Sequence, residues 1–132
     1  MFIQLEVLFL DSTYIPDKGF MQKFFRTDNR LNRKRYLFRA LGVGFCSGIV
    51  SFIMDRAGDD ASLILLGLLF VISIALIVSS VMLMIRRLHD LNRSGWFFLV
   101  GLVPLINFIF GLYLLFAKGT EGQNRFGADP LT

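Results

Sequence analysis

The longest uncharged stretch of the chain runs from Ala61 to Ile85 and constrains the fold more than any other feature. It holds 25 residues without one charged side chain. As a helix it would rise about 37 Å, whereas the hydrocarbon core of a bilayer is about 30 Å thick. Buried helices of soluble proteins rarely contain uncharged runs of this length, so we expect this segment to cross a membrane with some tilt.

Two further apolar runs predict additional spans. Residues 96–117 are 22 uncharged residues interrupted by Pro104, which removes a backbone donor and predicts a kink or break near Val103. Residues 36–54 contain Arg39 near the predicted helix end, where its long side chain can reach the membrane interface. The sequence therefore predicts an all-α integral membrane protein with three transmembrane helices at about 36–54, 61–85 and 96–117, the third kinked or broken near Pro104.

Composition agrees with a membrane protein and limits the available chemistry. Of the 132 residues, 55% are hydrophobic and 18% are charged, and the mean hydropathy is +0.61. Cys46 is the single cysteine, so neither an intrachain disulfide nor a cysteine metal cluster can form. One histidine does not provide a metal-ligand spacing either. We therefore expect no metal and no cofactor.

The distribution of basic residues predicts the orientation in the membrane. Residues 18–39 contain eight basic residues against one acid, Asp28. Residues 55–60, between the first two predicted spans, contain three aspartates and one arginine, whereas residues 86–95 contain three arginines and one aspartate. Short loops rich in lysine and arginine stay in the cytoplasm. We therefore expect the N-terminus and residues 86–95 to be cytoplasmic.

The side of the C-terminal tail depends on Pro104. Three spans, the default prediction, place residues 118–132 outside the cytoplasm. The alternative is that Pro104 turns residues 96–117 into a re-entrant hairpin, whose halves are too short to cross alone. The tail would then return to the cytoplasm.

Residues 1–20 are expected to be a divergent extension of a single membrane domain formed by residues 21–132. The apolar run at residues 2–10 is too short to span, and no basic residue precedes it as in a signal peptide. Met21 opens a basic segment typical of a natural beginning. The first 20 residues are therefore either a misassigned start or an interfacial segment.

Residues 86–96, RRLHDLNRSGW, form the densest polar stretch of the chain. Arg86 and Arg87 suit the C-terminal end of the second predicted span, because cations favour the helix dipole and the headgroup phosphates. Ser94 can cap the next helix, and Trp96 has the place of an interfacial aromatic residue. This account leaves four polar residues without a role: His89, Asp90, Asn92 and Arg93.

Three interpretations compete for these residues. A catalytic one makes His89 a general base oriented by Asp90, but adjacent residues rarely bring their side chains together and no nucleophile lies nearby, so we expect no enzyme activity. A structural one pairs Asp90 with Arg30 or Arg33, with Asn92 holding the loop. An anion-binding one places a phosphate beside the arginines and the helix N-terminus at residues 94–96, and in a membrane protein that phosphate is expected to be a lipid headgroup. Nucleic acid is not expected, because membrane topology already explains the basic segment. The predicted contacts with anionic lipid are Arg30, Arg33, Lys34, Arg35, Arg86, Arg87 and Arg93.

Small residues recur in the first predicted span. Ala40, Gly44 and Gly48 are four residues apart and allow close approach of another helix. Packing within the chain is the favoured interpretation, and a dimer seam is the alternative. The predicted spans contain no acid and no histidine, which a proton-coupled transporter normally needs.

These features predict a structural or interaction module. Its basic cytoplasmic face would contact anionic lipid or a partner protein, and the expected partners include copies of the same chain. The alternative is a subunit of an oligomeric channel or transporter.

A second motif, GTEGQNRFGADP at residues 119–130, follows the apolar run with its internal proline. In this order, the two motifs resemble those of the YhaH-like family of small bacterial inner-membrane proteins, a domain of unknown function numbered 805, over about residues 21–131. The resemblance implies a multi-pass protein of the bacterial inner membrane and no particular activity. The family commonly has a Gly-Arg pair where this chain has Asn29-Arg30, which leaves the local turn open. We assign a structural polar role to His89, Asp90, Asn92, Ser94, Trp96, Asn124, Arg125 and Asp129.

Overall fold

The computed structural model describes residues 14–58 and 61–131, and this part of the chain is helical. The elements in order are α2 (Gly19–Phe24), α3 (Arg33–Ala57), α4 (Leu63–Asp90), a 3-10 helix η1 (Gly95–Leu102) and α5 (Pro104–Phe116). The described residues contain no strand, so the all-α prediction is confirmed. The apolar run at residues 2–10 and two aspartates of the acidic loop, Asp59 and Asp60, lie outside the described residues.

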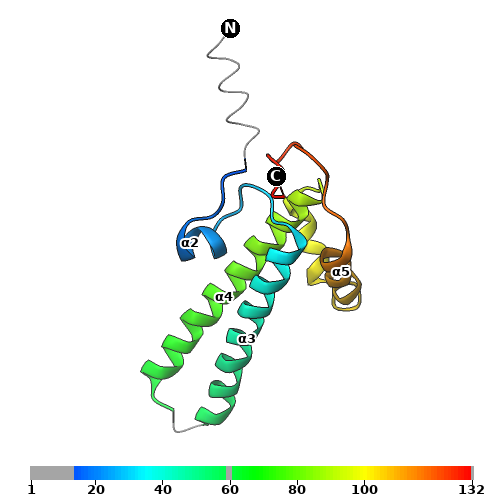
Figure 1. Ribbon diagram of the computed structural model, residues 1–132. Coiled ribbons are helices and arrows are strands. Elements are labelled where there is room, and N and C mark those ends of the chain that lie inside the picture. Colours follow the sequence, from blue (N-terminus) through cyan, green and yellow to red (C-terminus); the bar gives the residue numbers. More distant parts are fainter. Residues whose placement is uncertain (1–13, 59–60, 132) are drawn as a thin grey trace.

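Helices α3 and α4 form a long antiparallel pair (Figure 1). Asn32 caps α3 by accepting a hydrogen bond from the Arg35 amide at 2.9 Å, and Ser62 caps α4 by accepting one from the Leu65 amide at 3.2 Å. Both helices are long and apolar enough to cross a membrane. The first two predicted spans therefore correspond to helices: α3 extends beyond the predicted bounds at both ends, and α4 begins slightly later and ends later than predicted.

The helix pair packs along one face of each helix. The buried residues of α3 are Tyr36, Val43 and Val50, and their spacing of seven keeps them on one side. Leu69 and Leu83 of α4 are buried as well. Large apolar side chains on the other faces are exposed, including Phe38, Phe45, Phe52, Phe70 and Ile77. Exposed apolar faces of this extent are typical of helices that contact lipid.

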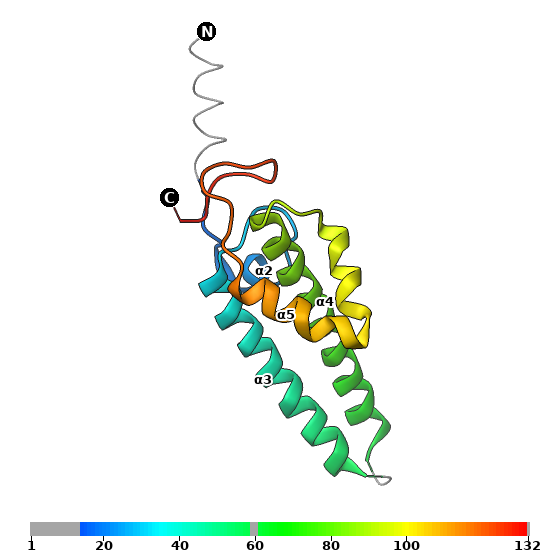
Figure 2. The ribbon, with the colours of Figure 1, turned by 90° about the vertical axis from the view of Figure 1, so that its right-hand side faces the viewer.

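Residues 96–117 form a broken hairpin. Val103 is extended, with φ −84° and ψ 114°, and Pro104 occupies the first turn of α5, where its missing donor costs nothing. Helix η1 follows α4, and α5 then crosses back towards the end of the pair where α3 begins (Figure 2). The two helices have 8 and 13 residues.

The hairpin bears out the predicted break within residues 96–117 and does not show a third span. The predicted break near Pro104 is confirmed. Two separate helices, η1 and α5, take the place of one continuous helix. They rise about 16 Å and about 20 Å, and each is shorter than the hydrocarbon thickness of about 30 Å. Among the described residues, α5 is an apolar helix of the shorter class, below the length of a candidate span.

The tail that follows α5 returns to the end of the pair where α4 ends. The carbonyls of Leu114 and Ala117 accept hydrogen bonds from Arg87, near the end of α4. Residues 14–32 and 117–131 therefore lie at the same end of the molecule, opposite the connection between α3 and α4 (Figure 1). We call this the polar end.

Candidate functional site

Two buried carboxylates organise the polar end. Asp90 is the last residue of α4, and Asp17 precedes α2. Their side chains are 4% and 1% exposed, and each pairs with buried arginine. Isolated charges would be very costly at such positions, so the surrounding partners decide whether this end of the protein is stable.

The Asp90 cluster consists of Asp90, Arg30 and Arg87. Arg30 Nη2 lies 3.1 Å from Asp90 Oδ1, and Arg87 donates to Asp90 Oδ2. Arg30 also donates to the carbonyls of Thr120 and Gly122, which are in the tail. The cluster thereby ties the segment before α3, the end of α4 and the tail together. Of the two pairings predicted for Asp90, the structure has the one with Arg30.

Gly119 lets the tail pass directly over Asp90. A Cβ atom at this position would lie 2.8 Å from Asp90 Cγ and still closer to Oδ2, distances that real Cβ atoms do not show. The adjacent Thr120 amide donates to the Asp90 carbonyl at 2.8 Å. The first glycine of the second motif is therefore required by close approach to a buried charge.

The remaining polar residues of the second motif shape the tail and attach it to α4. Asp129 accepts hydrogen bonds from the amides of Gly122 and Leu131, both at 2.9 Å. Asn124 Nδ2 donates to the carbonyl of His89 at 2.9 Å. The two motifs, distant in sequence, form one structure.

The structure revises one expectation for the first motif, that the Asn92 side chain holds the loop. Arg125 donates to the carbonyl of Asn92 at 3.2 Å, and Asn92 has a positive φ of 56°. Asn92 thus contributes a left-handed turn and a backbone carbonyl to the loop, and among the described residues no hydrogen bond of its side chain holds the loop. The His89 ring stacks on Phe126, with ring centroids 4.0 Å apart, while the Asp90 carboxylate contacts arginines. The two groups of the hypothetical acid–base pair have separate partners.

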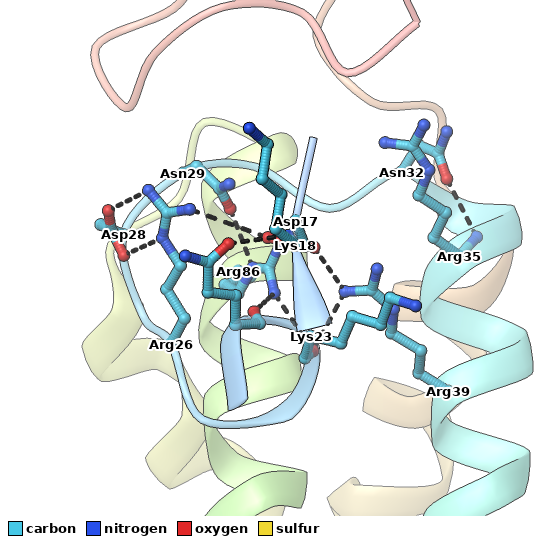
Figure 3. A network of polar contacts seen from close by, with 11 residues as sticks. Asp17, Lys18, Lys23, Arg26, Asp28, Asn29, Asn32, Arg35, Arg39 and Arg86 are labelled. Carbon is cyan, nitrogen blue, oxygen red and sulfur yellow. Dashed lines mark hydrogen bonds and ion pairs between the residues drawn. The ribbon is translucent and has the colours of Figure 1, made fainter. Parts of the chain in front are cut away.

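The Asp17 cluster consists of Asp17, Arg86, Arg39 and Arg26 (Figure 3). Arg86 Nη2 lies 3.0 Å and 2.7 Å from the two carboxylate oxygens of Asp17. Arg39 Nη1 lies 2.8 Å from Asp17 Oδ2, and Arg26 Nη1 lies 3.8 Å from Oδ1. Burial by itself raises the pKa of Asp17, but the hydrogen bonds and charges of Arg86 and Arg39 outweigh it and lower the pKa below the usual 3.8.

Sequence reasoning missed Asp17 because the residue lies in the segment interpreted as a divergent extension. The available signal was an acidic residue immediately before a strongly basic segment. The structure instead makes this carboxylate the partner of Arg86, which is wholly buried. Residues 14–20 are thus joined to the domain by a buried ion pair.

Asn29 resolves the question of the missing glycine. Its φ of 70° is in the left-handed region, which glycine adopts freely and asparagine tolerates better than most other residues. Its side-chain oxygen accepts a hydrogen bond from Arg86 Nε at 2.9 Å. Asparagine therefore keeps the turn that leads to Arg30 and adds a contact that glycine cannot make.

The predicted lipid-contact residues divide into three groups by burial. Arg30, Arg86 and Arg87 are wholly buried, so the prediction that they contact headgroups is wrong: their guanidinium groups are used inside the protein. Arg35 is half-buried, with its guanidinium carbon 5.0 Å from the Tyr14 ring centroid. The exposed members are Arg33, Lys34 and Arg93.

The predicted helix cap, Ser94, and the predicted interfacial aromatic residue, Trp96, lie at the start of η1. Ser94 occupies its N-cap position, but the side chain forms no capping hydrogen bond. Trp96 is 75% exposed, as expected for an aromatic residue at a membrane interface.

The predicted helix-packing residues have different surroundings. Ala40 packs against the core. Cβ atoms added at Gly44 and Gly48 would have no neighbour within 4 Å, because α3 uses Val43 and Val50 to contact α4. The favoured interpretation, packing within the chain, is therefore wrong for these two glycines.

Comparison with known proteins gives a consistent result. The sequence model of a family described as "Protein of unknown function (DUF805)" matches residues 24–128. The inner membrane protein YhaI of Escherichia coli K12 is 36% identical over 101 residues, which cover 76% of this chain and 82% of YhaI. The inner membrane protein YhaH of the same strain is 47% identical over 45 residues, which cover 34% of this chain and 37% of YhaH. The alignment thus spans little more than a third of YhaH, and no solved structure matches the chain.

Proposed function

The chain belongs to this DUF805 family of inner-membrane proteins, and from that premise we propose that it is a small membrane module whose basic end contacts anionic lipid in the cytoplasmic leaflet. In this proposal α3 and α4 cross the membrane. The polar end, including the N-terminal segment and the tail, is cytoplasmic. The η1–α5 hairpin enters the membrane from that side and leaves on the same side.

The position of the basic residues supports this orientation. Loops rich in lysine and arginine stay in the cytoplasm, and the polar end carries nearly all basic residues of the chain. Arg56, near the end of α3, is the exception at the opposite end. The contacts of Arg87 with the carbonyls of Leu114 and Ala117 support a tail on the same side as the end of α4.

The observation that carries the lipid proposal is the separation of the cations into two sets. One set is buried with Asp17 and Asp90. The other set is exposed and lies outside the two clusters: Lys18, Lys23, Arg33, Lys34, Arg93 and Arg125. Exposed cations close to anionic headgroups contribute about 1 kcal/mol each, and phosphate is the chemical group that suits them.

The test replaces Arg33, Lys34 and Arg35 together by glutamine. Purification in mild detergent followed by lipid analysis should show several-fold less phosphatidylglycerol relative to phosphatidylethanolamine, since three cations of about 1 kcal/mol each are removed. Arg56→Gln is the matched control, because it removes one exposed cation from the opposite end. An unchanged lipid ratio in the triple variant would refute lipid binding by this surface.

Self-association is a second candidate, favoured by the open surroundings of Gly44 and Gly48. Small residues on a lipid-facing surface let a second helix approach closely. Ser51→Cys, in a chain with Cys46→Ala, should form disulfide-linked dimers in membranes, and Gly48→Leu should reduce their yield. A channel or transporter would require such an assembly. Absence of cross-linking would therefore count against self-association and against a channel or transporter.

A further inference from the structure

An apolar groove lies between α2 and the α3–α4 pair. Its volume is about 350 Å³, within the range of pockets that bind small molecules. Phe20, Phe24 and Phe25 from the α2 region form one wall. The other walls come from α3 and α4 and include Val43 and Leu76. We call this cavity the α2 groove.

The α2 groove contains one buried hydroxyl without a partner. Ser79 lines the groove and is only 2% exposed. Its Oγ has no hydrogen-bond partner among the described residues. In contrast, the hydroxyls of Ser73 and Ser80, on the same helix, donate to backbone carbonyls four residues earlier. A buried unpaired hydroxyl is costly, which favours an occupant that brings an acceptor atom.

Positive charge lies at the cytoplasmic edge of the groove. Ser79 precedes Arg86 by seven residues, so the Asp17 cluster is about 10 Å further along α4. Lys18 precedes Phe20 and Lys23 precedes Phe24, and both lysines are exposed. The groove thus combines apolar walls beside the two candidate spanning helices with exposed ammonium groups on the adjoining α2 segment.

We infer that the α2 groove holds one acyl chain of an anionic phospholipid, whose phosphate group lies beside Lys18 and Lys23. This inference rests on the membrane placement proposed above, but it concerns a different surface from the Arg33–Arg35 patch. The phenylalanines of α2 cover the chain from the side. The ester oxygens are the acceptors that such a lipid brings towards the Ser79 hydroxyl.

The test uses the full chain in nanodiscs that contain phosphatidylglycerol with a diazirine group midway along one acyl chain. After illumination, mass spectrometry should place the label on groove residues such as Phe24 and Leu76. Gly42 also lines the groove, and a Cβ added there meets nothing within 4 Å, so Gly42→Phe fills the space without a backbone clash. Labelling of the groove should fall by about tenfold, because losing contact with a few methylene groups changes occupancy by that factor.

Gly67→Phe is the matched control, since Gly67 is equally open but does not line the groove. Its labelling should equal that of the unchanged chain. Labelling spread evenly over lipid-facing residues such as Phe52 and Phe70, or labelling unaffected by Gly42→Phe, would overturn the inference. If Gly42→Phe does not fold, the native Cys46, which lines the groove and is exposed, replaces it. Phosphatidylglycerol should slow its alkylation by a hydrophobic maleimide relative to phosphatidylcholine, and equal rates would refute the site.

The headgroup part is tested separately. Lys18→Gln with Lys23→Gln should remove the preference for phosphatidylglycerol over phosphatidylcholine and leave labelling by the acyl chain, whereas a persisting preference would overturn the role of the two lysines. The Arg33, Lys34 and Arg35 variant should retain groove labelling. In one outcome the groove is labelled specifically, but the Arg33, Lys34 and Arg35 variant co-purifies as much anionic lipid as the unchanged chain. That outcome would refute lipid binding by the exposed surface and leave the inference for the α2 groove standing.

Discussion

Replacement of Gly119 by alanine should disrupt the Asp90 cluster without removing any polar group. The added methyl group would lie 2.8 Å from Asp90 Cγ and closer to Oδ2, which is the oxygen that Arg87 contacts. Either the tail moves away or the carboxylate rotates. In both cases Arg30 loses partners, because it contacts both the carboxylate and the tail carbonyls.

The magnitude follows from the burial of this cluster. Both arginines are wholly buried, and the Asp90 side chain is 4% exposed. Breaking a buried ion pair costs about 3–5 kcal/mol, because a charge remains without compensation. Rotation of Asp90 within its well would cost only about 0.5–1.5 kcal/mol. Since the clash involves the paired oxygen itself, we expect the free energy of unfolding to fall by about 3 kcal/mol.

The assay is reversible unfolding in mixed micelles with increasing sodium dodecyl sulfate, followed by the fluorescence of Trp96, the only tryptophan. Gly67→Ala is the control, because its Cβ has open space within α4 and alanine favours a helix over glycine by up to about 1 kcal/mol. Gly119→Ala should add little in a chain that already carries Asp90→Ala, since the obstructed carboxylate is then absent. Equal stability of Gly119→Ala and the unchanged chain, or full additivity with Asp90→Ala, would refute this reasoning.

Three further predictions concern the two clusters. Asp90→Asn and Arg30→Gln should each destabilise the protein in detergent, and their effects on the unfolding free energy should be strongly non-additive. Arg33→Gln should change the unfolding free energy by less than about 1 kcal/mol. Additive effects of Asp90→Asn and Arg30→Gln would contradict the pairing. The lowered pKa of Asp17 means that its contribution is complete above the usual value of 3.8 and is lost as the pH falls through the folded value. Unfolding titrations should therefore show stability decreasing below about pH 4, less steeply in Asp17→Asn, and identical pH profiles would refute this role. Asn29→Gly should keep the fold at a small cost in melting temperature, whereas Asn29→Val should lower it strongly, because β-branched residues do not tolerate the left-handed backbone; equal melting temperatures would contradict the turn.

The apolar helices could be predicted from the sequence, but their ends could not. The uncharged run that ends at Ile85 defines the membrane part of α4, yet the helix continues to Asp90. Arginine and aspartate normally end an apolar helix at the interface. Here Arg86, Arg87 and Asp90 continue it because their charges are paired inside the protein.

The hairpin and the Asp17 cluster could not be predicted, for physical reasons. An apolar run with one proline fits either a kinked span or a hairpin, and the choice depends on contacts such as those of Arg87 with the carbonyls of Leu114 and Ala117. Asp17 is 69 residues from Arg86, and no periodicity links them. The pairing of Asp90 with Arg30 was within reach because Asp90 is the single acidic residue of residues 86–95, and residues 18–39 contain several arginines but one acid.

The contacts of Arg30 and Arg87 with residues 114–122 also fix an order of events during synthesis. Arg30 is made early, but its carbonyl acceptors belong to Thr120 and Gly122, and those of Arg87 include Leu114 and Ala117. Until these late residues leave the ribosome, neither guanidinium group can be buried at acceptable cost. The α3–α4 pair must therefore form while its polar end is still hydrated, and that end closes only after residues 114–122 have been synthesised.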